Sequence, residues 1–492
     1  MRLSHVMNVA GRILRLFGVM FLAPIVVALY YGERSDLGGF LLAGGASVVL
    51  GQVMVRASIA ADDLRRIEAL AVVSGTWLVV AQLGAIPYLW VGFGPVDALF
   101  ESMSGFTTTG ATILTDFEGL GRATMFWRSL TQWLGGMGVI TLFVAVLPRL
   151  AGDMRQLFFA EAPGPTDQKL TPHLRQTAAY LWRFYVGLTL AEVLALSLAG
   201  MPLYDAVNHS MTTLAAGGFS PRAESIMAFD SAAVEWIICG FMFLAGANFA
   251  LQYRAMLGRP QALFRDDEFR TYAAIVAVAA ASLTMLLWSS GIDGTVRTAT
   301  FQSLSILTTT GFASVDFNLW TDQAKVVLLA LMFIGGCAGS AAGGPKVLRH
   351  VLVGRYTLQE LRRTLHPRGV LPVKLGGAVV SEEIMRGVLI FFLFYILTFA
   401  VCAAVVIGFG ADIVSGLTAT IATLGNIGPG VAGVGPMESY AHLHPVSKVV
   451  LTLAMWIGRL EVLTVLALLR FEVWRSAHWK GAVRRDALAS VR

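Results

Sequence analysis

Charged residues are scarce in this chain, and cysteine is almost absent. Aspartate, glutamate, lysine and arginine make up 14% of the 492 residues, whereas hydrophobic residues make up 56%. With a mean hydropathy of +0.68, a soluble domain of this length could not bury so much apolar surface. The three cysteines, Cys239, Cys337 and Cys402, lie in apolar runs, so we expect small buried hydrophobes and neither a disulfide framework nor a metal site.

Patterns typical of enzymes are also missing. No Ser/His/Asp set and no carboxylate pair stands out, so we expect a protein that is not an enzyme and has no covalent cofactor. Gly428–Gly433 matches a dinucleotide-binding pattern but follows an apolar run, and Gly339–Lys346 has proline where a phosphate-binding loop needs glycine. His442 and His444 could bind a metal, but two histidines in one loop are more typical of solvated side chains.

What is present is a series of hydrophobic runs, most of them close to the 20 residues that cross about 30 Å of hydrocarbon. They predict an all-α polytopic membrane protein with ten spanning helices, in contact with membrane lipid. The runs are Ile13–Tyr31, Leu37–Val55, Ala69–Trp90, Met125–Leu147, Thr177–Ala199, Ala233–Leu257, Tyr272–Trp288, Ala324–Ile334, Val388–Phe409 and Lys448–Leu469.

The distribution of lysine and arginine predicts the orientation. The N-terminus, the tail Arg470–Arg492 and three long connections, Arg149–Arg175, Arg254–Arg270 and Lys346–Arg386, are basic, whereas the opposite loops are acidic or neutral. Both termini are therefore predicted to be cytoplasmic. The net charge of +6 then reflects this bias and indicates no nucleic-acid partner. No small-residue cleavage site follows the first run, so we expect it to remain as a membrane helix.

Four short segments resemble one another, and each ends on a glycine. They read Ser102-Met-Ser-Gly-Phe-Thr-Thr-Thr-Gly110, Ser210-Met-Thr-Thr-Leu-Ala-Ala-Gly-Gly218, Ser303-Leu-Ser-Ile-Leu-Thr-Thr-Thr-Gly311 and Thr420-Ile-Ala-Thr-Leu-Gly-Asn-Ile-Gly428. Their separation is far longer than the roughly 20–50 residues of solenoid repeats. It indicates four large units that each deliver one loop to a shared place.

Each unit reads as an outer helix, a half-crossing pore helix, a glycine-ended loop and a second helix. We therefore expect four pseudo-repeats around one central pore, preceded by an N-terminal helical pair. The predicted divisions are a two-helix extension (1–66), repeat 1 (67–150), repeat 2 (171–258), repeat 3 (268–350), a cytoplasmic connection (351–384), repeat 4 (385–470) and a cytoplasmic tail (471–492).

Irregular backbone inside a membrane survives only when it is buried in protein or lines a wet cavity, because each unpaired peptide group costs several kcal/mol in hydrocarbon. An ion selectivity filter meets that condition, since carbonyl oxygens can replace the hydration shell of a cation. The alternative is that these glycines only allow close helix packing. Four segments in matching frame, each between two hydrophobic runs, favour the filter.

Two further features lie within hydrophobic runs. Residues 335–346 contain five glycines and a proline, which predicts a broken helix or loop, with a kinked packed helix as the alternative. Arg459 is expected in the middle of the last helix, where a charge faces a watery cavity or a partner. The alternative is a structural ion pair with Glu461 or another carboxylate.

These segments resemble the superfamily of Trk, Ktr and HKT potassium transporters, and most of all the TrkH type, over nearly the whole chain. The motifs that carry the resemblance are the four glycine-ended loops together with Trp133-Leu-Gly-Gly-Met-Gly138, Gly343-Gly-Pro-Lys346 and Gly458-Arg459-Leu-Glu461. The resemblance implies potassium uptake across a bacterial inner membrane, a homodimer, and a cytoplasmic nucleotide-binding ring subunit of the TrkA type that gates it.

The resemblance also implies roles for single residues. The potassium-binding filter would be formed by Thr108, Thr109, Gly110, Ala216, Gly217, Gly218, Thr309, Thr310, Gly311, Asn426, Ile427 and Gly428. An intramembrane gate below it would include Gly335, Gly336, Gly339, Gly343, Gly344 and Lys346, and Arg459 would lie in the pathway. The chain departs from the family at Ala215-Ala216, where a hydroxyl residue is common, and at Leu424-Gly425, where a polar pair is usual.

Three functions stay open at this point. The first is a channel-like potassium transport subunit, and the second is a carrier that couples potassium to protons or sodium. The third is a non-conducting membrane sensor or scaffold. Few ionisable residues lie inside the helices, which argues against a proton relay, and the intact glycines argue against a scaffold.

Overall fold

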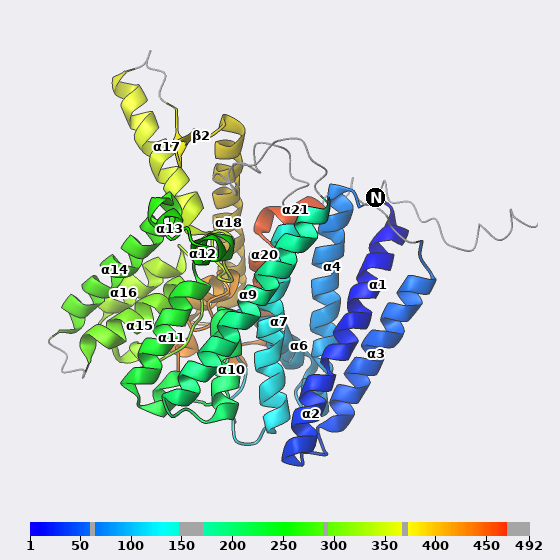
Figure 1. Ribbon diagram of the computed structural model, residues 1–492. Helices are drawn as coiled ribbons and strands as arrows, with labels where there is room; N and C mark the ends of the chain where they lie inside the picture. Colours follow the sequence, from blue (N-terminus) through cyan, green and yellow to red (C-terminus); the bar gives the residue numbers. More distant parts are fainter. Residues whose placement is uncertain (60–63, 147–170, 289–293, 367–371, 470–492) are drawn as a thin grey trace, which may run out of the picture. The chain divides into compact units, whose positions relative to one another are not determined.

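The computed structural model describes residues 1–59, 64–146, 171–288, 294–366 and 372–469, and shows a helical protein with one short hairpin (Figure 1). The tail 471–492 and most of the basic connection Arg149–Arg175 lie outside these residues. Within them, six helices are long and apolar enough to cross a membrane, and a bent pair makes a seventh if it counts as one span. The predicted all-α polytopic membrane fold is confirmed.

Backbone contacts divide the chain into two compact units. The first contains residues 1–103, 118–128 and 460–492, and the second contains 104–117 and 129–459. All four glycine-ended loops belong to the second unit. Each unit is described by itself below.

The first unit is built on the N-terminal helices. Its elements are α1 (Leu3–Met20), α2 (Leu22–Tyr31), α3 (Leu37–Arg56), α4 (Arg66–Gly84), α5 (Ile86–Trp90), most of α6 (Pro95–Phe106), the start of α7 (Arg122–Val146) and α21 (Val462–Leu469). Helices α1 and α3 approach closely because Gly11 and Gly51 face one another. A Cβ on Gly11 would lie 2.7 Å from the Gly51 carbonyl oxygen. Trp127 forms the core, stacked on Phe21 with ring centroids 4.4 Å apart.

The second unit contains the rest of the repeats. Its helices include α9 (Thr171–Leu198), α10 (Leu203–Leu214), α11 (Ala232–Ala245), α12 (Phe249–Met256), α13 (Gln261–Arg265), α14 (Asp267–Leu287), α15 (Thr295–Leu307), α16 (Asp322–Met332), α17 (Val347–Leu365), α18 (Glu382–Gly408), α19 (Ile413–Leu424) and α20 (Pro445–Arg459). Strands β1 (Lys374–Leu375) and β2 (Ala378–Val379) pair in antiparallel register. Their hairpin packs its apolar side chains on α17 and α18.

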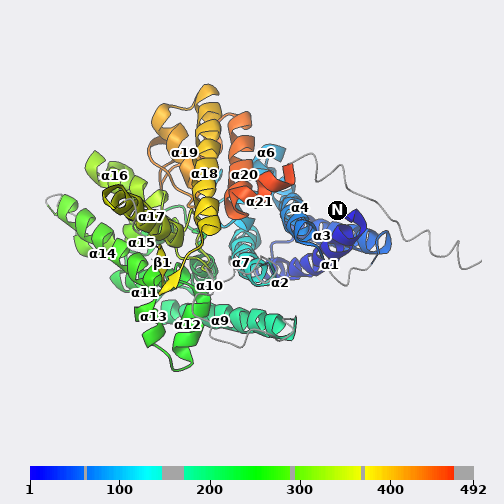
Figure 2. The same cartoon turned by 90° about the horizontal axis from the view of Figure 1, so that it is seen from above.

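Helices of one repeat lie together. In the second repeat α9, α10 and α11 contact one another, as do α14, α15 and α16 in the third and α18, α19 and α20 in the fourth. The last three lie side by side in the view from above (Figure 2). In each trio the middle helix is short, with 12 or 13 residues, because it stops at the glycine-ended loop.

Three of the second helices are interrupted, the third-repeat helix as the sequence predicts and those of the second and fourth repeats against the expectation of unbroken spans. The predicted run Ala233–Leu257 is two helices, α11 and α12, with a bend of 105° between them. Helix α16 ends at Met332, and the chain stays irregular until α17 begins at Val347. The predicted run Lys448–Leu469 is interrupted after Arg459, where Glu461 adopts a left-handed φ of 66°. Among the second helices only α7 is continuous over its described length.

Candidate functional site

The four short helices α6, α10, α15 and α19, which the sequence predicts as pore helices, end in the same way. In each, the residue two positions before the final glycine adopts a left-handed conformation: Thr108 (φ 52°), Ala216 (φ 53°), Thr309 (φ 57°) and Asn426 (φ 54°). The next residue then donates its N–H to the carbonyl five residues back, with lengths of 2.8–2.9 Å from Thr109, Gly217, Thr310 and Ile427. This is the Schellman helix ending, repeated four times.

The final glycines share a second constraint, which is close contact with a neighbouring loop. Each has a positive φ: 81° at Gly110, 75° at Gly218, 79° at Gly311 and 102° at Gly428. A Cβ on Gly110 would lie 2.1 Å from the Gly217 carbonyl oxygen, and one on Gly218 would lie 1.9 Å from that of Thr310. Cβ atoms essentially never approach so closely, so no residue with a side chain fits.

The same contacts close a ring. A Cβ on Gly311 would lie 2.1 Å from the Ile427 carbonyl oxygen, and one on Gly428 would lie 2.7 Å from that of Thr109. Each loop therefore touches the next in the order 1, 2, 3, 4 and back to 1. The structure thus brings together all twelve residues that the sequence predicts for a filter. Loops 1 and 3 are diagonally opposite, as are loops 2 and 4.

A pair of threonine hydroxyls bridges the loop on only one diagonal of this ring. In loop 1 the Oγ1 atoms of Thr107 and Thr109 are 2.8 Å apart, and in loop 3 those of Thr308 and Thr310 are also 2.8 Å apart. Loops 2 and 4 carry Ala215 and Gly217, and Gly425 and Ile427, at these positions. They are held by other side chains. In loop 4 the Tyr440 hydroxyl donates to the Gly428 carbonyl at 2.7 Å.

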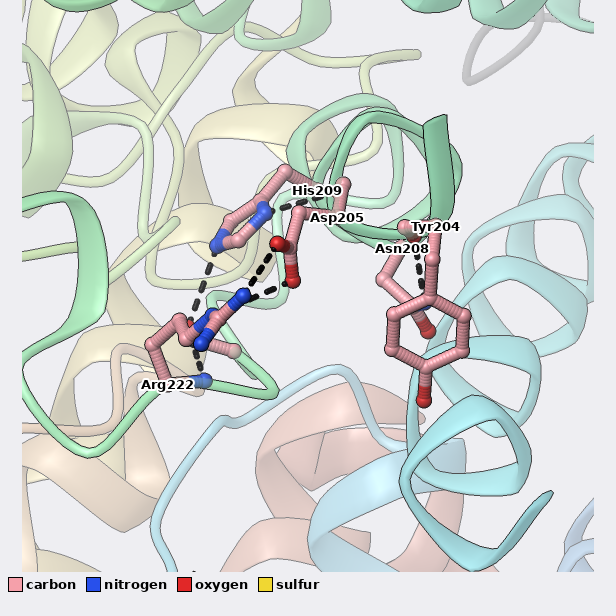
Figure 3. Close-up of polar contacts among 6 residues, drawn as sticks. Tyr204, Asp205, Asn208, His209 and Arg222 are labelled. Atoms are coloured by element: carbon pink, nitrogen blue, oxygen red, sulfur yellow. Dashed lines mark hydrogen bonds and ion pairs between the residues drawn. The ribbon is translucent and has the colours of Figure 1, made fainter. Parts of the chain in front are cut away.

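A polar network holds the chain that follows loop 2 against α10 (Figure 3). Arg222 forms a two-pronged ion pair with Asp205, with Nη2–Oδ2 at 2.6 Å and Nε–Oδ1 at 3.3 Å. The Nδ1 atom of His209 lies 2.8 Å from the Asp205 carbonyl oxygen, so it carries the proton. Its Nε2 then accepts from the Ser220 hydroxyl at 3.0 Å. No motif in the sequence indicates these four residues.

The irregular segment between α16 and α17 contacts the ring. The Gly343 N–H donates to the Thr309 hydroxyl at 2.6 Å, and a Cβ on Gly343 would lie 2.4 Å from the Gly425 carbonyl oxygen. Gly335, Gly339 and Gly344 have left-handed φ values, as does Lys346, whose Nζ donates to the Ala342 carbonyl. The predicted break in this helix is confirmed.

Glu268 on α14 anchors that segment at two points. One carboxylate oxygen, Oε1, accepts from the Ala338 N–H at 2.6 Å and from the Leu348 N–H at 3.1 Å. One buried carboxylate oxygen therefore binds both the irregular segment and the start of α17, where that segment ends. Sequence reasoning missed Glu268, although a glutamate near the start of a hydrophobic run is an available signal.

Arg459 lies at the end of a helix, not in the middle of one as expected. It is the last residue of α20 and is only 6% exposed. Its Nη1 donates to the Ala341 carbonyl, in the irregular segment, at 2.8 Å. Nε and Nη2 have no hydrogen-bond partner among the described residues. The guanidinium therefore joins α20 to the irregular segment.

Other sequence candidates gain no support as sites. Cys239, Cys337 and Cys402 are buried free thiols, as expected. Over the described ranges, no cluster of three or more His, Cys, Asp and Glu side chains could hold a metal. The Nδ1 atom of His442 donates to the Ser439 carbonyl, three residues earlier, at 2.9 Å. Gly428–Gly433 follows helix α19 and not a strand, which is not the context of a dinucleotide-binding pattern.

The family model described as the TrkH cation transport protein matches residues 61–479. The chain belongs to the TrkH family. A cation transport protein is consistent with the long apolar helices described above.

Individual relatives extend over almost the full chain. The Trk system potassium uptake protein TrkH of Salmonella typhimurium is 38% identical, and the match covers 96% of this chain and 100% of that relative. TrkG of Escherichia coli, named for the same system, is 34% identical, with 97% of this chain and 100% of the relative covered. The crystal structure of the potassium transporter TrkH from Vibrio parahaemolyticus matches with a TM-score of 0.88 and 35% identity, over 96% of this chain and 100% of that one.

Replacement of Gly218 by alanine tests the crowding at the ring. Gly32 is a matched control, since both glycines have a φ of 75° but a Cβ on Gly32 would meet nothing within 4 Å. We expect Gly32→Ala to cost about 1–2 kcal/mol of backbone strain. Gly218→Ala should cost about 1–3 kcal/mol more, because a backbone carbonyl must move. Thermal unfolding of the purified variants, monitored by size-exclusion chromatography, measures the stability loss of each variant. Equal losses would show that the ring is looser than described.

Proposed function

We propose that the protein takes up potassium across the bacterial cytoplasmic membrane through the ring of four loops, which acts as its selectivity filter. The observation that carries the proposal is the closure of the ring by four glycine-to-carbonyl contacts. Four segments from distant parts of the chain thus approach one another, each through a glycine that lies against a backbone carbonyl of the next. The names of the relatives as potassium uptake proteins support potassium as the ion.

The charge distribution at the ring favours a cation. Four pore helices end there, and the C-terminus of a helix carries about half a negative charge from its carbonyl dipoles. Thr108, Thr109, Ala216, Gly217, Thr309, Thr310, Asn426 and Ile427 are buried, whereas Gly110, Gly218 and Gly311 keep some exposed surface. A dehydrated monovalent cation would therefore meet backbone oxygens and negative dipole ends, which is the requirement for a filter.

We further propose that residues 335–344 form the gate. The segment touches the ring through Gly343 and is tied to Arg459 through Ala341, so a movement of the segment would reach both the filter and a charge beneath it. The positive-inside distribution supports cytoplasmic termini. We keep the four predicted repeats as the functional divisions, and we propose a homodimer with a cytoplasmic TrkA-type ring as its regulatory partner, which the name "Trk system" of the relatives supports.

Flux in liposomes tests the proposal directly. Purified protein in vesicles should pass potassium and rubidium down their gradients and pass sodium more slowly. Potassium driven against its own gradient by a proton or sodium gradient would favour the coupled carrier instead. Vesicles with folded protein and no potassium flux in the presence or absence of such gradients would contradict both.

The first glycine of the ring should govern ion preference. Gly110→Ser adds a side chain where a Cβ would already lie 2.1 Å from the Gly217 oxygen. The neighbouring loop must move outward, which spoils the fit to a dehydrated potassium ion more than the fit to a hydrated sodium ion. We expect the relative permeability to sodium to rise, measured by paired potassium and sodium fluxes. An unchanged ratio in folded protein would refute the assignment of Gly110.

Shortening the irregular segment should open the pathway. Deletion of Ser340–Ala342 removes the carbonyl that Arg459 binds and leaves too little chain to reach the ring. Basal potassium flux should rise while the potassium-to-sodium ratio stays near that of the wild type, because the four loops are untouched. A deletion variant that folds and keeps wild-type basal flux would count against a gate.

Arg459 should restrain potassium flux by repulsion. Two unit charges about 8 Å apart repel by roughly 2 kcal/mol at an effective dielectric constant near 20, which corresponds to a rate change of about thirtyfold. Water reduces this effect, so Arg459→Ala should raise flux by less than that and leave selectivity unchanged. Arg459→Lys keeps the charge and should stay close to the wild type. Loss of folded yield without a gain in flux per folded molecule would favour a structural role.

A further inference from the structure

Gln132 on α7 is a fully buried glutamine whose side chain is bound to loop 2 at both ends. Its Nε2 donates to the Gly217 carbonyl at 2.6 Å, and its Oε1 accepts from the Phe219 N–H at 3.0 Å. Its exposed fraction is 0%. One amide group thus spans Gly218, the residue that closes the ring against loop 3.

This contact explains why the residue at position 217 is glycine. Gly217 does not adopt a left-handed φ, unlike Gly218, so backbone conformation does not require glycine there. A Cβ on Gly217 would lie 2.5 Å from both Cδ and Oε1 of Gln132. The corresponding residues of the other loops are Thr109, Thr310 and Ile427, and all carry side chains. In loop 2, the Gln132 side chain occupies the space that a loop residue fills elsewhere.

In repeat 4 an amide side chain also joins the loop to the second helix, but there the amide belongs to the loop. A Cβ on Gly135 of α7 would lie 2.1 Å from the Phe106 carbonyl oxygen, and one on Gly458 of α20 would lie 2.0 Å from that of Leu424. The two helices therefore contact their pore helices at corresponding positions, and three residues earlier Gln132 corresponds to Met455. There, Asn426 of loop 4 donates from Nδ2 to the Met455 carbonyl at 3.0 Å.

We propose that Gln132 is a positioning residue that sets the ion preference of the ring. This inference rests on the proposed filter. The Gly217 carbonyl that Gln132 holds is the one that faces Gly110, so it is part of the contact between loops 1 and 2. Release of this carbonyl would change the separation of two loops and not only the shape of one.

Gln132→Met tests the role, since methionine keeps the length of the side chain and loses both hydrogen bonds. We expect the potassium-to-sodium flux ratio in liposomes to fall by about tenfold, the effect of one net buried hydrogen bond on a ratio of rates. Gln252→Met is the matched control, because Gln252 is a buried glutamine whose Nε2 binds the Leu244 and Ala247 carbonyls at the α11–α12 bend and not a filter loop. It should keep the wild-type ratio.

A second pair of variants decides the matter if Gln132→Met folds poorly. Gly217→Ala alone places a methyl group against the Gln132 amide, and Gln132→Ala removes the obstacle. The double variant should therefore fold better than Gly217→Ala alone and should have a higher ion ratio than the product of the two single effects. Independent losses from the two changes would overturn the inference, as would a folded Gln132→Met with a ratio within about twofold of the wild type.

The outcome is separate from that of the proposed function. If wild-type vesicles pass potassium selectively and the Gln132 variants keep the same potassium-to-sodium flux ratio, only the role of Gln132 is overturned. Wild-type vesicles without selective potassium flux would contradict the filter itself. Folded yield by size-exclusion chromatography, measured beside each flux, separates a lost fold from a changed preference.

Discussion

The approach of a glycine Cα to the carbonyl oxygen of the next loop is the contact on which the rest of the second unit depends. It occurs four times, and no side chain larger than hydrogen fits at any of them. The pore helices must stop before the ring, which explains why α6, α10 and α19 have 12 residues and α15 has 13. The second helices must in turn come close to those helix ends. Gly135 and Gly458 permit this for α7 and α20.

The breaks in the second helices depend on one another. Backbone groups left free at the α11–α12 bend bind those of the irregular segment. The Cys337 N–H donates to the Gly246 carbonyl at 2.8 Å, and the Phe249 N–H donates to the Gly339 carbonyl at 3.1 Å. An unpaired peptide group is costly at membrane depth, so two irregular segments are stable together where each alone would not be. Glu268 accepts two more of these N–H groups.

Hydropathy and the spacing of the four glycine-ended segments were sufficient to predict a polytopic helical fold and to place the short pore helices. The glycines and Pro345 were sufficient to predict the break after α16. The breaks at Gly246 and at Glu461 could not be predicted in the same way. The first has a single glycine, and the second places a left-handed φ on a glutamate, for which local sequence has no preference. Gln132, Glu268 and the Asp205–Arg222 pair act through partners distant in sequence, which a single chain without a structure cannot reveal.

The alternation of threonine pairs around the ring has a mechanical consequence. Loops 1 and 3 each contain a hydroxyl bridge within the loop, whereas loop 2 is bound by the Gln132 side chain of α7 and loop 4 binds the Met455 carbonyl of α20 through its own Asn426. A displacement of α7 or α20 therefore acts directly on loop 2 or loop 4, which share one diagonal of the ring. Loops 1 and 3, on the other diagonal, keep their internal hydroxyl bridges under such a displacement.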